Sequence, residues 1–167
     1  MVLLFCGTAF CSNPVFGDLD KDGVLDKAQI DGTVITVTFT KKVIRAKKAI
    51  FDGYPTYLSI KKNVLFITYE GGARDKWTEV FKWRLDASKR DFVLIGSTYE
   101  VEDTVGKDPK ETVDINYVTG RVNRVIGKTK RYCSFKAKKV YLTKFNLVDQ
   151  KDDLLAEAHN ACFIKDE

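Results

Sequence analysis

Apolar and polar residues alternate along most of this chain, with the period of two that half-buried strands show. The alternation is clear in residues 33–51, TVITVTFTKKVIRAKKAIF, and again in residues 77–85, WTEVFKWRL, where Trp77, Phe81 and Trp83 share one face. An apolar face backed by a polar one is typical of an antiparallel sheet that packs one side against a core. We therefore predict a mainly β fold.

Turn signals separate the strand candidates at short intervals. KKN separates TYLSI from VLFITYE, DASKRD separates WTEVFKWRL from FVLIGSTYEVED, and Thr119-Gly120 separates ETVDINYV from RVNRVIG, while KKVYLTKFNL (138–147) is the last strand candidate. Consecutive strands joined by short turns are usually neighbours in space. We expect a meandering antiparallel sheet, curled into a sandwich or a partial barrel.

The pattern changes near the end of the chain. In QKDDLLAEAHNACF (150–163), Leu154, Leu155, Ala158 and Cys162 recur near helical spacing, which predicts a short C-terminal helix. The length of 167 residues and the hydrophobic content of 44% fit one domain with its own core. We assign residues 12–167 to a single β-rich domain.

The first eleven residues, MVLLFCGTAFC, carry no charge and are apolar from Val2 to Phe10. Ala9 and Cys11 occupy the −3 and −1 positions of a small-residue cleavage site, so residues 1–11 resemble a truncated signal peptide. This interpretation predicts a periplasmic or extracellular location. Two alternatives are a buried strand and a lipoprotein signal at Cys6. The sequence contains no run of eighteen apolar residues, so it predicts no transmembrane span.

Removal of such a leader leaves two cysteines, Cys133 and Cys162, in a compartment that permits disulfides. Their pairing closes a loop of about thirty residues, worth roughly 3 kcal/mol in the chain-entropy model. It pins the C-terminal segment to the last strands. The alternative joins both cysteines and His159 as zinc ligands, although this spacing matches known zinc sites poorly.

Residues 17–29, GDLDKDGVLDKAQ, crowd four aspartates into one loop, a costly arrangement unless a cation or water compensates the charge. Alternate aspartates bring their carboxylates into one pocket when the backbone curls, and Gly23 permits the sharp turn. Hard oxygen ligands of this kind select Ca²⁺. The candidate metal ligands are the carboxylates of Asp18, Asp20, Asp22 and Asp26 and the backbone carbonyl of Val24.

The loop departs from an EF-hand at its twelfth position, where Gln29 replaces the bidentate glutamate, and no amphipathic helices flank it. The pattern D-x-D-x-D-G-x-x-D before a strand instead resembles the calcium loops of FG-GAP and VCBS repeats. GDLDKDGVLD, YLSIKKNVLFITYEGG, RDKWTEVFKWRL, FVLIGSTYE and NYVTGRV together resemble a group of uncharacterised secreted bacterial β-proteins. The resemblance implies a β fold and an exported location, and it brings no known activity.

Charge and aromatic residues add little to this picture. The net charge of +5 is modest and spread along strand patterns, which argues against nucleic acid as a partner. A set of six aromatic residues fits core packing better than a stacking surface for sugars or bases. It comprises Trp77, Phe81, Trp83, Phe92, Tyr99 and Tyr117.

Catalytic signatures are sparse. His159 is the single histidine, and G-x-S-x-G, P-loop and H-E-x-x-H motifs are absent from the sequence. The sequence favours a secreted or periplasmic non-catalytic binding domain with one structural calcium loop, whose partner is a protein or an envelope polysaccharide. The alternatives are a hydrolase that uses carboxylates such as Glu100 and Glu102, and an inhibitor or immunity protein of a secreted enzyme.

Overall fold

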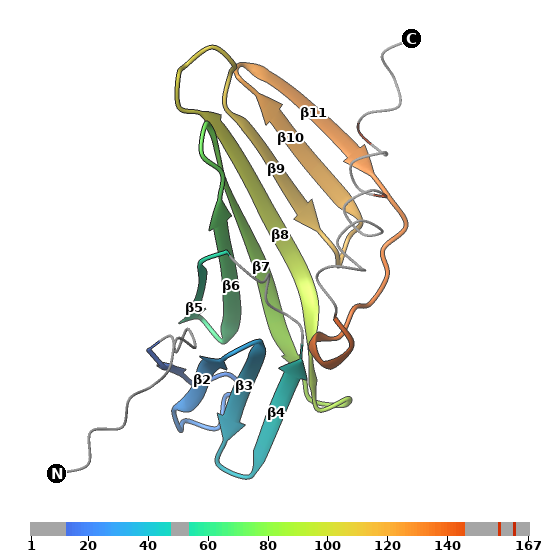
Figure 1. The fold of residues 1–167 in the computed structure, drawn as a ribbon. Helices are drawn as coiled ribbons and strands as arrows, with labels where there is room; N and C mark the ends of the chain where they lie inside the picture. Colours follow the sequence, from blue (N-terminus) through green and yellow to red (C-terminus); the bar gives the residue numbers. More distant parts are fainter. Residues whose placement is uncertain (1–12, 48–53, 146–156, 158–161, 163–167) are drawn as a thin grey trace, which may run out of the picture.

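The computed structural model describes residues 13–47 and 54–145 together with Glu157 and Cys162. It contains two antiparallel sheets (Figure 1), which confirms the mainly β prediction. The smaller sheet has the order β1-β2-β3-β4, with strands Val15–Gly17, Asp26–Asp31, Val34–Phe39 and Lys42–Lys47.

The larger sheet has seven strands in the order β11-β10-β9-β8-β7-β6-β5. They are β5 (Thr56–Lys61), β6 (Val64–Gly71), β7 (Asp75–Asp86), β8 (Asp91–Asp103), β9 (Glu111–Asn116), β10 (Arg121–Ile126) and β11 (Thr129–Ser134). Chain order and spatial order agree, as expected for a meander. Its two edge strands, β5 and β11, do not pair with each other, so the sheet is not closed into a barrel.

One connection shows how local chemistry sets this topology. Gly120 has a φ of +66° in the turn between β9 and β10, as its place in the sequence predicts. Its N–H donates to Asn116 O at 2.9 Å, and its carbonyl accepts from Phe135 N at 2.8 Å. A Cβ atom here would lie 2.2 Å from Phe135 O, so this position requires glycine.

The structure differs from the sequence prediction in several stretches, and β1, β2 and β11 are strands that the sequence analysis did not predict. The alternating residues 33–51 contain a hairpin, because the chain turns at Thr40-Lys41 between β3 and β4, and residues 48–53 lie outside the described part. The predicted last strand, 138–147, is wrong over its described residues 138–145: Tyr141 forms a single bridge with Val93, and the short 3₁₀ helix η1 (Leu142–Lys144) follows. Leu142 and Phe145 are both buried there, which breaks the alternation of a strand.

The core lies on the inner face of the seven-stranded sheet. Phe145 packs edge-on against Trp83 and Phe81, with ring centroids 5.1 and 5.5 Å apart. The smaller sheet adds a second set of buried side chains and meets the larger sheet through the stacked rings of Phe39 and Phe92. β1 also packs beside β5, so the N-terminal sheet covers one end of the larger one (Figure 1).

Two predicted segments fall wholly or largely outside the described residues. The leader at residues 1–11 is one of them. The other is the C-terminal helix, of which only Glu157 and Cys162 are described, both in helical conformation. Among the described residues, no helix is long and apolar enough to cross a membrane.

Candidate functional site

The acidic loop connects β1 to β2 and gathers three of its aspartates. Ligand oxygens of Asp18, Asp20 and Asp22 all lie within 4.8 Å of one another. Three carboxylates at this separation repel one another, so the arrangement needs a compensating charge or open water. The structure thus brings together the three alternate aspartates that the sequence singles out.

Hydrogen bonds within the loop hold the backbone curled around these carboxylates. Gly23 N donates to Asp18 Oδ2 at 3.2 Å, Val24 N donates to Asp22 Oδ1 at 2.8 Å, and Asp22 N donates to Asp20 Oδ1 at 3.2 Å. Gly23 has a φ of +85°, the left-handed turn expected at this position. The carbonyl of Val24 as a ligand stays a prediction.

Asp26 is the first residue of β2 and lies outside the cluster of three. Its side chain is 1% exposed, and its Oδ2 accepts from Leu19 N at 2.7 Å. The other oxygen, Oδ1, is buried and has no hydrogen-bond partner in the described part of the chain. Burial raises the pKa of Asp26, and the nearby charges of Asp20 and Asp22 raise this pKa further.

The loop is anchored on both sides. Leu19 is buried in the core, and Asn63 Nδ2, from the turn between β5 and β6, donates to Asp18 O. This contact ties the loop to the larger sheet. The position of the carboxylates therefore depends on packing between the two sheets as well as on the loop itself.

Basic side chains lie next to the loop and offer a second way to compensate its charge. Asp20 and Asp22 line a hollow of about 380 Å³ together with Lys41, Lys42 and Arg90. Lys42 Nζ donates to the carbonyl oxygen of Arg90. Burial and the charge of Arg90 lower the pKa of Lys42.

The two cysteines that the sequence analysis expects to pair lie at disulfide distance. The Sγ atoms of Cys133 and Cys162 are 2.04 Å apart, and the Cα atoms are 5.5 Å apart. Cys133 lies on the inner face of β11, against the core. Sulfur atoms bonded to each other are not thiolate ligands, so this pairing does not fit the zinc alternative. His159 lies outside the described residues.

The predicted carboxylate pair on β8 lies at the surface. Glu100 Oε2 accepts from Lys110 Nζ at 2.7 Å, and the two side chains are 44% and 51% exposed. Glu102 is exposed and lies across the sheet from Lys76. An exposed ion pair of this kind is common on protein surfaces.

Glu79 is a buried acid that the sequence prediction missed. It is 0% exposed on the inner face of β7, between Tyr69 on β6 and Tyr99 on β8. Burial and the charge of Glu79 raise the pKa of both tyrosines. Burial is the main reason that the pKa of Tyr117 is raised to about 12. The signal was available, because Glu79 interrupts the apolar face that Trp77 and Phe81 define.

The six aromatic residues singled out in the sequence contribute to the core. Phe81, Trp83, Phe92 and Tyr117 are buried, and the other two, Trp77 and Tyr99, are partly buried against them. Core packing was thus the correct interpretation. An aromatic side chain that is open to a ligand lies elsewhere: Tyr132 on β11 is 75% exposed.

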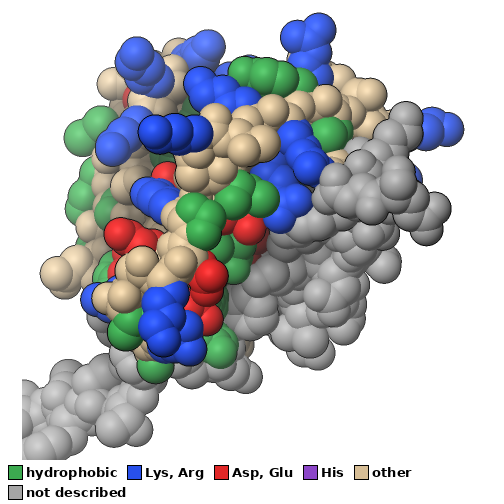
Figure 2. All heavy atoms as spheres, turned by 90° about the horizontal axis from the view of Figure 1, so that it is seen from above, with side chains coloured by type: hydrophobic (Ala, Val, Ile, Leu, Met, Phe, Trp, Pro, Cys, Tyr) green, Lys and Arg blue, Asp and Glu red, His purple; other side chains and the backbone are tan. Residues whose placement is uncertain are grey.

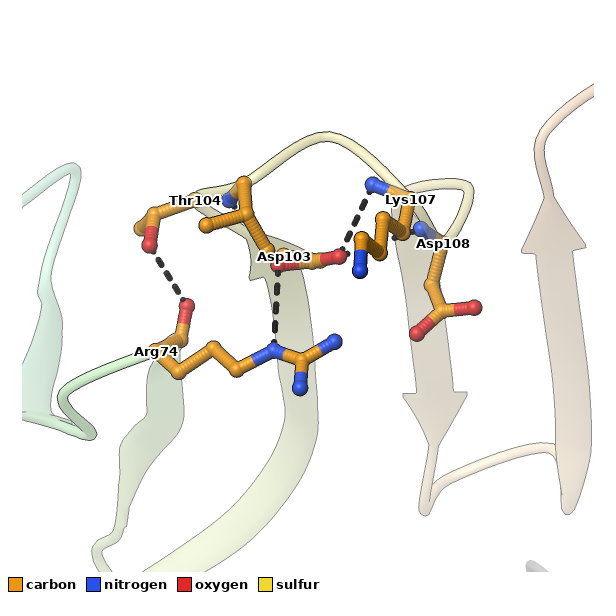
Figure 3. A network of polar contacts seen from close by, with 6 residues as sticks. Arg74, Asp103, Thr104, Lys107 and Asp108 are labelled. Atoms are coloured by element: carbon orange, nitrogen blue, oxygen red, sulfur yellow. Dashed lines mark hydrogen bonds and ion pairs between the residues drawn. The ribbon is translucent and has the colours of Figure 1, made fainter.

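The end of the larger sheet away from the acidic loop carries a fixed turn (Figure 3). Asp103 Oδ1 accepts from Val105 N at 2.9 Å, and its Oδ2 accepts from the N–H groups of Lys107 and Asp108 at 2.9 and 3.2 Å. Arg74 Nε lies 3.7 Å from Asp103 Oδ1. The backbone hydrogen bonds, led by that from Val105, and the charge of Arg74 lower the pKa of Asp103.

A second hollow lies on the outer face of the larger sheet. Its volume is about 830 Å³, and it spans β7 to β11. In the described part of the chain, β9 packs beside β8 and β10, and β10 packs beside β11. The outer side chains that line it are Lys82, Ile95, Asp114, Asn116, Arg121, Asn123, Tyr132 and Ser134.

Comparison of the chain with protein-family models, curated proteins and solved structures found no match. The acidic loop, the cysteine pair and the outer hollow are therefore interpreted from their own geometry.

Proposed function

We propose that this protein is an exported, non-catalytic binding domain that one Ca²⁺ stabilises. The hollow on the outer face of the larger sheet is the observation that carries the binding role. Side chains from five neighbouring strands line it, so the sheet backbone fixes their spacing before a ligand arrives. Sites on rigid strands position polar groups better than sites on loops.

The calcium assignment rests on two observations. Three aspartates bring oxygens within 4.8 Å of one another, and Asp26 carries a buried oxygen without a hydrogen-bond partner in the described residues. A buried carboxylate oxygen without a donor is costly, and a cation would relieve both this cost and the mutual repulsion. Several carboxylates and a carbonyl at flexible distances favour Ca²⁺ over Mg²⁺. This is also the role that the FG-GAP and VCBS resemblance of the loop implies.

Export is the third part of the proposal. Cys133 and Cys162 at disulfide distance fit an oxidising compartment. The leader predicted over residues 1–11 agrees with this location. Both features favour the periplasm or the extracellular space.

Calorimetric titration of the metal-free full chain tests the ion. We expect Ca²⁺ to bind with a 1:1 stoichiometry and more tightly than Mg²⁺, and the double variant Asp18→Ala, Asp20→Ala to lose the heat. Asp31→Ala is the matched control, because Asp31 is an exposed aspartate at the end of β2 outside the loop. Absence of heat and of any thermal shift in millimolar Ca²⁺ would show that the loop does not hold calcium.

Substrate turnover tests the non-catalytic assignment. Glycan and peptide substrates incubated with the full chain should remain intact. Turnover that Glu100→Gln or Glu79→Gln abolishes would support the hydrolase alternative and contradict a pure binding role.

A further inference from the structure

The register of the larger sheet lines up polar residues across the hollow. Lys82 lies beside Gly96, Gly96 beside Asn116, Asn116 beside Arg121, and Arg121 beside Ser134. These five positions cross β7 to β11. With about 4.8 Å between neighbouring strands, the row is about 19 Å long. Such a length suits an extended chain better than a single small molecule.

Gly96 leaves the floor of this row open. A Cβ atom at Gly96 would lie 3.1 Å from Ile115 O and 3.5 Å from Lys82 Cδ, so a side chain would occupy the middle of the hollow. The register between β7 and β8 also shifts at Lys82/Trp83, which marks a β-bulge. Bulges commonly redirect side chains next to functional sites.

The neighbouring row holds a hydrogen-bonded chain across three strands. Lys82 Nζ donates to Thr98 Oγ1 at 2.9 Å, and Thr98 Oγ1 donates to Asp114 Oδ1 at 2.7 Å. The Asp114 carboxylate is thereby fixed while its other oxygen can accept from a ligand. Fixed polar groups lose little entropy when a ligand binds.

Asn123 and Tyr132 complete the recognition groups. Asn123 on β10 pairs with Asp114 on β9, and Tyr132 on β11 pairs with Asn123. Asn123 Oδ1 is buried and has no hydrogen-bond partner within the described part of the chain, so a side-chain rotation that turns it toward a ligand hydroxyl breaks no hydrogen bond of this oxygen. Tyr132 is 75% exposed and offers a flat apolar ring at the edge of the hollow.

The charge of the hollow is positive. Lys82 and Arg121 line the hollow together with Asp114, and neither cation forms an ion pair in the described residues. Figure 2 looks onto the end of the sheet that carries the β8–β9 and β10–β11 connections and shows Lys and Arg side chains at several places there, with fewer Asp and Glu side chains among them. Exposed Lys128 and Lys130 belong to this end. Such a field attracts anionic ligands.

We propose that the outer face of β7–β11 binds an acidic oligosaccharide. A sugar ring lies on Tyr132, ring hydroxyls donate to Asp114 and Asn123, and uronic carboxylates of different sugar units accept from Arg121 and Lys82. The hydroxyl donors of such a ligand match the acceptors of the hollow, its apolar ring face matches the exposed tyrosine, and its anionic groups match the two cations. This inference rests on the binding function proposed above and names the class of its ligand.

The test uses the full chain and oligomers of galacturonate, of alternating glucuronate and N-acetylglucosamine, and of mannuronate. Each oligomer is paired with its carboxyl-reduced counterpart. We expect at least one acidic oligomer to bind by calorimetry, and its reduced counterpart to bind at least about tenfold more weakly. Amide chemical-shift changes should map to β9–β11.

Variants place this binding on the hollow. Tyr132→Ala and Arg121→Gln should each weaken the acidic oligomer at least about tenfold. Tyr57→Ala and Lys61→Gln are the matched controls, because Tyr57 and Lys61 are an exposed tyrosine and an exposed lysine of β5, outside the hollow. Both controls should keep the wild-type affinity. The circular dichroism of all four variants should match the wild-type spectrum.

Three results would overturn the inference. Equal affinity for acidic and reduced oligomers would contradict the charge selection, and unchanged affinity in Tyr132→Ala and Arg121→Gln would place the saccharide elsewhere. Absence of saccharide binding together with capture of a protein partner would contradict the ligand class while the binding function stands. Cleavage of an oligomer by the full chain would instead contradict the proposed non-catalytic function.

Discussion

The substitution Asp20→Asn should change stability in opposite directions with and without Ca²⁺. It keeps an oxygen that accepts from Asp22 N and removes one of three charges whose oxygens lie within 4.8 Å of one another. In water two unit charges 4.8 Å apart repel by about 0.9 kcal/mol, and the substitution removes two of the three pairs. The metal-free variant should therefore gain about 2 kcal/mol at low ionic strength, and less in salt.

With Ca²⁺ present the sign reverses. A ligand at a hundred times its dissociation constant stabilises the folded state by about 2.7 kcal/mol, and a variant that binds weakly loses this gain. Thermal unfolding in EDTA and in millimolar Ca²⁺ measures both arms, with Asp31→Asn as a control that should shift neither. A metal-free Asp20→Asn protein that unfolds at a lower temperature than wild type would refute the reasoning. That result would mean that Lys41, Lys42 and Arg90 already compensate the loop.

Three further predictions concern the rest of the fold. The pKa of Asp103 is lowered, so its contribution to stability is present above pH 3.8 and is lost as the pH falls through the pKa of the folded state. Urea unfolding at falling pH should show this loss of stability in wild type and in Asp108→Asn, and Asp103→Asn should largely remove it. Cys133→Ser should destabilise the protein by about 3–4 kcal/mol, since the closed loop spans 29 residues, and limited proteolysis should then cut the C-terminal segment first while the sheet survives. Phe145→Ala should cost about 3–5 kcal/mol in the free energy of unfolding by urea, because this ring is 2% exposed and packs on Trp83 and Phe81, whereas an equal loss for the exposed Val118→Ala would contradict this.

Alternation along the chain was enough to predict the sheet. Side chains of β6 and β7 change faces at every residue, and short polar turns such as Lys62-Asn63 fix which strands are neighbours. The acidic loop was predictable for the same local reason, since its internal hydrogen bonds join residues at most seven positions apart. Its anchor to Asn63 was not, because that contact joins residues 45 positions apart.

Tertiary packing explains the failed prediction at 138–147. The backbone there pairs with β8 through the Val93–Tyr141 bridge and the bond from Leu94 N to Val140 O, and Thr143 N donates to the Asp91 side chain. Leu142 and Phe145 then turn into the core from η1. A segment that covers the core at the end of a sheet has the apolar composition of a strand, but it does not pair as a strand does. Periodicity alone does not separate the two.

The outer hollow is a property of register rather than of any one strand. Tyr132 and Cys133 are adjacent in β11, yet strand alternation sends Cys133 to the core side, where it meets Cys162, and leaves Tyr132 on the outer face. The same alternation on β10 sends Arg124 inward to Glu111 at 2.6 Å and leaves Asn123 facing the hollow. A slip of one residue in either pairing would exchange these faces. The cysteine pair on one side of β11 therefore supports the register on which recognition from the other side depends.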